Sequence, residues 1–235
     1  MTTSSATVVT AIVPAAGRGV RVGAEQNKIL LPLLDKPLLV WTLQALDRCP
    51  FITDVVVAVQ EAETNRVADL LRRYALQKSV TLVVGGTERQ DSVRHALQSV
   101  TEDCPFVLVH DAARPLVTPE VCARVLHAAL TVGAAIAAVP CLDTVKAVDA
   151  HGRVERTLDR RTLRLVQTPQ VFRTDLLRQA HAAAQRDAFI ATDDAALVER
   201  VGHPVQVVMG SYDNIKITEA RDLLVAESIL KGRGY

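Results

Sequence analysis

The chain has 235 residues, 49% of them hydrophobic, and its 27 Lys and Arg residues balance 26 Asp and Glu residues to leave a net charge of +1. This balance disfavours a general nucleic-acid-binding protein, which carries a large basic excess. No run of apolar residues approaches the ~18 of a membrane-spanning helix, so we expect neither nucleic acid nor a membrane as a partner.

The four cysteines are widely spaced and form no C-x-x-C pair, which disfavours zinc and thioredoxin-type chemistry. The N-terminal residues Met-Thr-Thr-Ser-Ser lack the basic and apolar regions of a signal peptide. We therefore expect a cytoplasmic protein with four buried, reduced thiols. These are Cys49, Cys104, Cys122 and Cys141.

Short β-branched runs alternate with segments of helical periodicity along the chain. The runs are apolar almost throughout, which is typical of strands covered on both faces. Between them, apolar residues recur at helical spacing, as at Leu39, Leu43 and Leu46. This alternation predicts an α/β fold with a mostly parallel sheet. The predicted strands are residues 7–13, 54–59, 80–84, 106–110, 134–139 and 205–208.

A long loop, residues 14–36, follows the first predicted strand. Pro32 and Pro37 interrupt any earlier helix, so we expect the first helix to open at Pro37, since proline suits the first helical position. Loops of this length in compact domains are usually functional or disordered. The apolar residues at positions 29–34 favour a functional loop.

The stretch VPAAGRGVRVG, residues 13–23, places glycines directly after the first strand. The pattern G-x-x-x-x-G-K-[ST] does not occur, which excludes a P-loop. A dinucleotide site requires a helix that starts on the loop and an acidic residue at the end of the second strand. The prolines and the late second strand disfavour that arrangement. Gly17 and Gly19 instead allow an anionic ligand to approach backbone amides closely.

Arg21 and Lys28 add positive charge to the same loop. A triphosphate attacked at its α-phosphorus needs such charge, because negative charge grows on its oxygens in the transition state. The alternative is that both residues are solvated loop cations, and for these two residues taken alone it is the stronger interpretation. The remaining motifs weigh against it.

Three further motifs follow predicted strands, at the edge where ligands bind to open parallel sheets. Asp111, in the second of them, is a candidate ligand for a divalent cation that bridges phosphates. Alternatively, it caps the next turn. His110 is expected to be a structural residue at a strand end. The motifs are GGTERQDS at residues 85–92, HDAARP at residues 110–115 and DNIKIT at residues 213–218.

Residues 141–166 break the alternation of strands and helices. Two β-prone runs, residues 143–148 and 153–158, flank a turn that contains Gly152, which predicts a hairpin. This long, polar, arginine-rich hairpin needs a surface to pack against, and a partner subunit is the simplest one. We therefore expect a single domain, residues 1–235, with residues 141–166 as a dimerisation arm.

Eight short motifs occur in the order VPAAGRGVR, GGTERQDSV, VHDAARP, DTVK, DR, TPQVF, ATDDAALVE and DNIKIT. In this order they resemble the family of 2-C-methyl-D-erythritol 4-phosphate cytidylyltransferases, from residue 7 to residue 231. The resemblance implies a Rossmann-like fold of nucleotide-diphospho-sugar-transferase type and a β-arm that forms homodimers. It also implies CTP and methylerythritol phosphate as substrates, and Mg²⁺ or another divalent cation such as Mn²⁺ as cofactor.

The resemblance implies a role for each matching residue. Arg21 and Lys28 resemble the pair that stabilises the pentacoordinate α-phosphate. Lys216 resembles the residue that places the phosphate nucleophile against CTP, and Arg160 completes the catalytic set. Asp111 resembles the carboxylate beside the ribose and Mg²⁺. The implied nucleotide-binding residues are Pro14, Ala15, Ala16, Gly17, Gly19, Gly85, Gly86, Ser92 and Asp111. The implied sugar-phosphate residues are Arg114, Thr144, Arg160, Thr168, Thr192, Asp193 and Lys216, with Thr144 and Arg160 reaching the partner's site from the arm.

Two positions depart from the pattern of the family. Ile29 follows the loop lysine where Gln is usual, and Thr87 follows the double glycine where an acidic or amide residue is usual. Two other functions remain open: cytidylyl transfer to another polyol phosphate, such as ribitol 5-phosphate, and a non-catalytic nucleotide-binding module. Thr144, Arg160 and Thr192 favour methylerythritol phosphate, and the intact set of basic residues disfavours the non-catalytic module.

Overall fold

The computed structural model describes residues 8–17 and 27–235 and is built around a seven-stranded sheet. From edge to edge its strands are β11 (Gln206–Met209), β7 (Ala134–Pro140), β10 (Arg164–Arg173), β6 (Phe106–Val109), β1 (Val9–Pro14), β4 (Ile52–Val59) and β5 (Ser79–Val84). β1 pairs in parallel with β4 and β6, β4 with β5, and β7 with β11. Of these seven strands, only β10 runs antiparallel to its neighbours. The predicted α/β fold with a mostly parallel sheet is confirmed.

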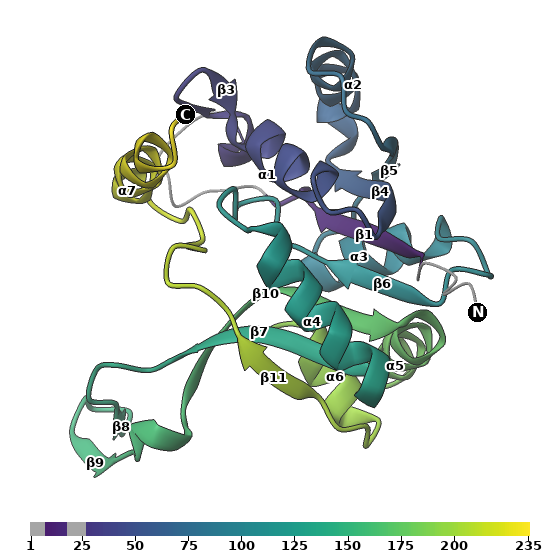
Figure 1. Ribbon diagram of the computed structural model, residues 1–235. Coiled ribbons are helices and arrows are strands. Elements are labelled where there is room, and N and C mark those ends of the chain that lie inside the picture. Colours follow the sequence, from purple (N-terminus) through teal and green to yellow (C-terminus); the bar gives the residue numbers. More distant parts are fainter. Residues whose placement is uncertain (1–7, 18–26) are drawn as a thin grey trace, which may run out of the picture.

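Helices cover both faces of this sheet (Figure 1). They are α1 (Leu38–Asp47), α2 (Thr64–Arg73), α3 (Arg89–Gln98), α4 (Pro119–Val132), α5 (Thr174–Arg186) and α6 (Asp194–Arg200). A further helix, α7 (Ala220–Gly232), packs beside α1 and the small strand at residues 32–33. α1, α2 and α4 pack on one face, and α3, α5 and α6 pack on the other. Alternate side chains of β1 point to opposite faces of the sheet. Ala11 and Val13 belong to the buried apolar cluster on the face of α1, α2 and α4, and Ile12 belongs to the cluster on the other face. Burial of both faces explains why the strands read as continuous apolar runs.

The sequence pattern does not predict β10, although it lies inside the sheet. Its central residues Gln167, Thr168 and Gln170 are polar, so no apolar run marks the strand, yet all three are buried. β10 begins at Arg164, inside the segment expected to be arm only. Its pairing with β7 shifts register between Val166 and Gln170.

The six predicted strands are present, and each described end lies within two residues of the predicted one. Residue 7 lies outside the described residues. The first helix begins at Leu38, and Pro37 is its N-cap residue, so the prediction that Pro37 opens the helix is wrong by one position.

The loop expected between β1 and α1 has regular structure in its described part. It contains the 3₁₀ helix η2 (Lys28–Leu30) and the paired strands β2 (Pro32–Leu33) and β3 (Lys36–Pro37). The indole nitrogen of Trp41 donates to the carbonyl of Leu33 at 2.7 Å, which ties this segment to α1. Two further 3₁₀ turns are η3 (Glu61–Glu63) and η4 (Arg160–Thr162).

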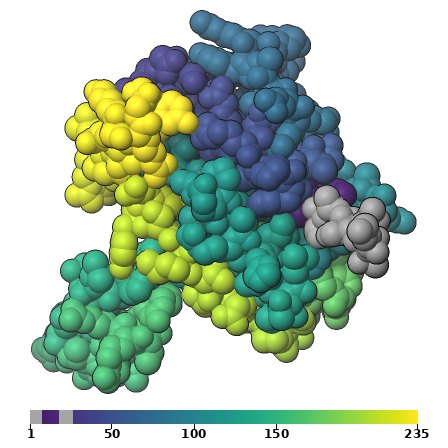
Figure 2. Space-filling model, viewed as in Figure 1, coloured from purple at the N-terminus to yellow at the C-terminus, as the bar shows by residue number. Residues whose placement is uncertain are grey.

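A two-stranded hairpin projects from the body, as Figures 1 and 2 show. Its strands are β8 (Lys146–Val148) and β9 (Val154–Thr157), which pair antiparallel where the sequence predicts a hairpin. Gly152 in the turn has a φ of 76°, a left-handed conformation that glycine adopts without steric cost. Val148 and Val154 are exposed on this hairpin.

All four cysteines are free and buried, in agreement with the expectation of reduced thiols. The Sγ of Cys104 lies 3.3 Å from the hydroxyl of Thr10, within the sheet. In residues 8–17 and 27–235, no helix combines the length and the apolar character needed to cross a membrane.

Candidate functional site

Two adjoining cavities lie at the carboxyl ends of the parallel strands. The first, of about 430 Å³, is bordered by the segments that follow β1, β5 and β6. The second, of about 440 Å³, extends over β10 to the start of α6. Arg89, Asp111 and Lys216 line both cavities. Ligands in the two cavities therefore meet at this shared wall, at the sheet edge where open α/β folds bind ligands.

Asp111 is the acidic residue of the shared wall. Its Oδ1 accepts a hydrogen bond from Arg89 Nε at 3.0 Å, and its Oδ2 lies 2.8 Å from Lys216 Nζ and 3.7 Å from Arg114 Nε. Burial alone would raise the pKa of this carboxyl, but the charges of Arg89 and Lys216 outweigh burial and hold the pKa well below its usual value. Arg89 also pairs with Asp194, so three cations face two carboxylates, and the positive excess that remains suits an anionic ligand.

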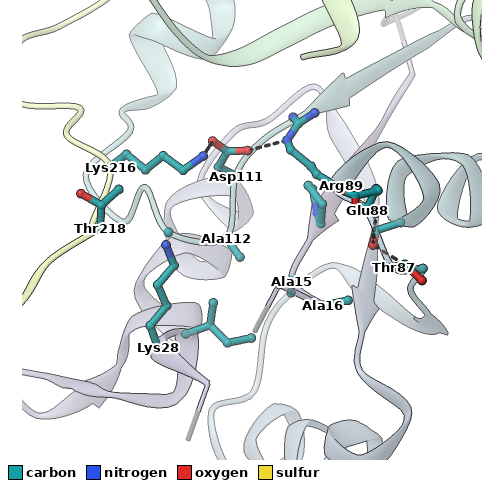
Figure 3. A pocket seen from close by; sticks show the side chains of 16 residues that line it. Ala15, Ala16, Lys28, Thr87, Glu88, Arg89, Asp111, Ala112, Lys216 and Thr218 are labelled. Carbon is teal, nitrogen blue, oxygen red and sulfur yellow. Dashed lines mark hydrogen bonds and ion pairs between the residues drawn. The ribbon is translucent and has the colours of Figure 1, made fainter. Parts of the chain in front are cut away.

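Lys28 and Lys216 reach the first cavity from separate segments, and Figure 3 shows both near Asp111. Lys28 Nζ donates to the carbonyl of Ile217 at 3.0 Å. The turn that carries Lys28 is anchored by Asn27, whose side-chain amide donates to the carbonyl of Ala15 at 3.2 Å. This anchor holds the lysine beside the end of β1.

His110 is buried beneath the cavity floor and is neutral. Burial lowers the pKa of its imidazole to about 4. Its Nε2 lies 3.0 Å from the carbonyl of Arg114, which can only accept, so Nε2 carries the proton. Its Nδ1 then accepts from the hydroxyl of Thr168 at 3.1 Å, and that hydroxyl in turn accepts from the amide of Asp111 at 2.9 Å. These bonds fix the strand end that carries Asp111, a structural role as expected.

The loop after β5 packs closely on the end of β1. A Cβ at Gly85 would lie 2.4 Å from the Cβ of Ala16 and 2.8 Å from Ser92 Oγ, so only glycine allows this approach. Ser92 Oγ accepts from the amide of Gly86 at 3.1 Å and donates to the carbonyl of Glu88 at 3.2 Å. Backbone and small side chains thereby form the side of the first cavity where these two segments meet.

Comparisons with known proteins find one and the same family over nearly the whole length of the chain. The family model of 2-C-methyl-D-erythritol 4-phosphate cytidylyltransferase matches residues 9–232. The chain belongs to this family. A relative of that name from Bacillus thuringiensis (strain Al Hakam) is 48% identical over 221 residues, covering 94% of this chain and 97% of its own. A second, from Pelotomaculum thermopropionicum, is 46% identical over 226 residues, covering 96% and 95%.

Solved structures of the family are also similar. The crystal structure of 2-C-methyl-D-erythritol 4-phosphate cytidylyltransferase from Thermus thermophilus matches with a TM-score of 0.78 and 37% identity, covering 95% of this chain and 99% of that one. That of 4-diphosphocytidyl-2C-methyl-D-erythritol synthase from Anaerococcus prevotii matches with a TM-score of 0.86 and 28% identity, covering 97% and 100%.

Most residues expected from the cytidylyltransferase family lie around the two cavities. Gly85 lies directly behind Ala16 in the wall of the first cavity. The first cavity is lined by Pro14, Ala15, Ala16, Gly17, Lys28, Gly86, Ser92, Asp111 and Lys216. The second is lined by Arg114, Thr168, Thr192, Asp193, Asp111 and Lys216.

Two described residues from the expected set, Thr144 and Arg160, are not brought to these cavities. Gly19 and Arg21 lie outside the described residues. Thr144 and Arg160 are exposed and line neither cavity, and the guanidinium of Arg160 donates to the carbonyl of Leu142 within the arm. Within this chain, the hairpin of β8 and β9 and the turn that carries Arg160 line neither cavity, and of residues 141–166 Val166 lines the second one.

The two departures from the pattern of the cytidylyltransferases, Ile29 and Thr87, both line the first cavity. Ile29 is 3% exposed and belongs to the core cluster beneath α1, so it contributes shape to the cavity and no hydrogen bond from its side chain.

Arg89 is the main residue of the site that the sequence does not single out. It lies in the GGTERQDS motif, and its side chain forms ion pairs with both Asp111 and Asp194. The one feature of the sequence that could have indicated Arg89 is that it is the single basic residue of this motif. The partner Asp194 is 105 positions away, so spacing does not reveal the pair.

Replacing Asp111 by Asn removes the carboxylate that three cations share. We expect the free energy of unfolding to fall by about 3 kcal/mol, since removing one member of a buried ion pair leaves uncompensated charge. Urea denaturation followed by circular dichroism measures this loss. Asp187→Asn, which breaks the exposed pair with Arg200, is the control and should cost less than about 1 kcal/mol. Equal losses in the two variants would contradict this account of the charge cluster.

Proposed function

We propose that this chain transfers the cytidylyl group of CTP to 2-C-methyl-D-erythritol 4-phosphate, giving 4-diphosphocytidyl-2-C-methyl-D-erythritol and pyrophosphate in non-mevalonate isoprenoid precursor synthesis. The observation that carries the proposal is the pair of adjoining cavities with Arg89, Asp111 and Lys216 in their common wall. A reaction that joins a nucleotide to a sugar phosphate needs two neighbouring sites and positive charge between them, because both substrates are polyanions.

The first cavity is the nucleotide site in this proposal. Gly85 and Gly86 have no Cβ, so their backbone packs directly on Ala16, Ser92 and Asp91 and forms a close wall of the first cavity, against which a flat base can lie. Lys28, at the other side of the cavity, contacts the phosphates. The segment from Pro14 to Gly17 provides the backbone amides around them.

The second cavity is the sugar-phosphate site. Arg114 lines it, and its Nη1 donates to the carbonyl of Asn214 at 2.7 Å, which leaves guanidinium charge facing the cavity. Asp193 accepts from Gln170 Nε2 at 2.8 Å and caps α6 through the amide of Ala196 at 3.0 Å. Arg114 therefore binds the phosphate of methylerythritol phosphate. Asp193, together with Thr168 and Thr192, binds its hydroxyl groups.

The reaction needs no general base. A phosphate monoester has a second pKa of about 6, so its oxygen is already nucleophilic at neutral pH. This oxygen forms a bond to the α-phosphorus of CTP as the bond from that phosphorus to the bridging oxygen breaks. Pyrophosphate leaves with the electron pair. Lys28 and Arg21 stabilise the charge that grows on the α-phosphate, and Lys216 holds the attacking phosphate beside it.

Asp111 fits a Mg²⁺ site of the kind that substrates complete. Among the described residues, no group of three or more His, Cys, Asp or Glu side chains is arranged to hold a metal ion. Mg²⁺ binds nucleotides through one or two carboxylates, with phosphate oxygens and water as its other ligands. The ionised Asp111 in the common wall is such a carboxylate, for Mg²⁺ or Mn²⁺. When bound there, the cation neutralises phosphate charge.

The proposal includes a homodimer formed through residues 141–166 as the arm of a single domain, residues 1–235. Leu142, Val154 and Leu165 on the arm are 65%, 60% and 54% exposed, so a second copy that covers them gains hydrophobic free energy. Thr144 and Arg160 lie on the same projection, away from both cavities of their own chain. They contribute to catalysis only across the dimer interface. The four free thiols fit the reducing cytoplasm as its location.

Release of pyrophosphate from CTP, measured with several polyol phosphates, tests the activity. We expect turnover with methylerythritol phosphate and at least about ten times lower kcat/KM with ribitol 5-phosphate, since the loss of one or two polar contacts costs this much. Preference for ribitol 5-phosphate would assign the alternative substrate. Binding of CTP without turnover on any polyol phosphate would assign the non-catalytic module.

Lys28→Ala should lower kcat by about 100-fold, as expected when one donor to a developing charge is lost. Arg21→Ala, outside the described residues, should have an effect of similar size. Lys36→Ala is the matched control, because Lys36 lies on the same segment and lines neither cavity. Steady-state kinetics with both substrates measures kcat. A Lys28→Ala enzyme with the kcat of the control would remove Lys28 from the mechanism.

The shared site predicts complementation between two inactive variants. Arg160→Ala and Lys216→Ala homodimers should each be inactive. After subunit exchange, mixed dimers carry one site with both native residues, so roughly a quarter of wild-type activity should return, because half of the dimers are mixed and each has one intact site. Exchange is verified by mass spectrometry of differently tagged chains. Proven exchange without recovery would exclude a site completed by the partner's arm.

A further inference from the structure

We propose that Asp194 and His181 are positioning residues that orient Arg89 and, through it, Asp111. The inference rests on the proposed function and assigns roles to two buried residues outside the substrate-contacting set.

A continuous chain of polar contacts runs from α5 to the shared wall. His181 Nε2 lies 3.1 Å from Asp194 Oδ1, and Asp194 Oδ2 lies 2.7 Å from Arg89 Nη1. Arg89 Nε then donates to Asp111 Oδ1 at 3.0 Å. The four residues come from α5, the first turn of α6, the first turn of α3 and the segment after β6. Neither His181 nor Asp194 lines the first cavity or the second, so both act behind the contact surface.

Asp194 remains charged although it is 1% exposed. Burial alone would raise the pKa of its carboxyl, but the charge of Arg89 and the hydrogen bond from His181 outweigh burial and lower the pKa. A buried ion pair of this kind contributes little net stability, because its desolvation offsets its attraction. Its effect is geometric, since it restricts the guanidinium to one orientation.

One guanidinium nitrogen of Arg89 is left without a protein partner among the described residues. Its Nη2 is buried and has no hydrogen-bond partner in the described part of the chain, while Nη1 and Nε bond to Asp194 and Asp111. The guanidinium is planar and its donors point in fixed directions. With two of its nitrogens held, the direction of Nη2 is set as well. Arg89 lines both cavities, so its fixed guanidinium presents positive charge to a phosphate at their junction.

The neighbouring residue, Gln90, ties the same two segments together. Its Nε2 donates to the carbonyl of Phe189 at 3.0 Å, and its Oε1 accepts from the amide of Ala191 at 2.9 Å. The segment that carries Thr192 and Asp193 is thus held against the start of α3. The same contacts between α3 and residues 189–191 therefore hold both Arg89 and the wall of the second cavity in place.

A double-mutant cycle on kcat/KM tests the role of Asp194. Asp194→Asn keeps the shape and removes the charge, and we expect kcat/KM to fall by about 10- to 100-fold, within the range for a lost charged contact in a site. In an Arg89→Lys background, which lacks the planar fork, the same change should cost less than about 2-fold, because the residue it acts through has already lost its geometry. An equal factor in both backgrounds would mean that Asp194 acts on folding alone and would overturn the proposal.

Substitutions of His181 provide a second, independent test. His181→Gln can place an amide donor near Asp194, and His181→Leu cannot. We expect kcat/KM of the Leu variant to fall by about 10-fold and that of the Gln variant to stay within about 3-fold of wild type, in line with the loss or retention of one hydrogen bond to a charged group. Equal losses in the Gln and Leu variants would contradict a role through this hydrogen bond. If Asp194→Asn does not fold, the comparison of the two His181 variants decides whether the proposal holds.

Two controls separate this proposal from the assignment of the activity. Asp187→Asn, at the exposed pair with Arg200, should leave kcat/KM unchanged. Folded Asp194→Asn with wild-type kcat/KM would overturn the positioning role and leave the activity intact. If the wild type itself showed no turnover, the activity would fail. The cycle would then be measured as CTP affinity by calorimetry, where an unchanged Kd in Asp194→Asn would overturn the positioning role.

Discussion

The arrangement of cations around one buried carboxylate, Asp111, is the constraint on which the rest of the site depends. Arg89, Arg114 and Lys216 reach it from α3, from the segment after β6 and from the segment after β11. Such a cluster gains little free energy from its own ion pairs. The apolar layers on the two faces of the sheet therefore provide the stability that keeps these like charges together.

The pattern of apolar residues predicts six of the seven strands for a physical reason. The inner strands among them, β7, β6, β1 and β4, are covered on both faces, so apolar side chains occupy nearly every position. The edge strands β5 and β11 are partly exposed, and their apolar β-branched residues mark them as strands. β10 differs because Gln167, Thr168 and Gln170 bond to neighbouring loops and strand ends inside the protein, which makes burial of polar groups possible. Hydropathy cannot distinguish such a strand from a surface segment.

The motifs predict most of the members of the site, since each follows a strand whose carboxyl end lies at the same edge. They do not predict Arg89 or Asp194 as a pair, because the contact depends on how α3 and α6 dock, and sequence spacing carries no information about that docking. Thr144 and Arg160 are a different case. The resemblance to the family assigns them to the site, but in this chain both are exposed. Their role in the site depends on a second chain, so the structure of one chain does not show it.

The register shift in β10 has an evolutionary consequence. Residues 164–166 pair with the carboxyl end of β7, next to the arm, and residues 170–172 pair with its amino end, in two separate registers. A residue inserted or deleted on the arm side can be absorbed at the irregular step between them, without moving Gln170 or Phe172 relative to the sheet. Arms of different length and sequence can therefore arise by mutation while the half of the strand that follows the step keeps its place in the sheet.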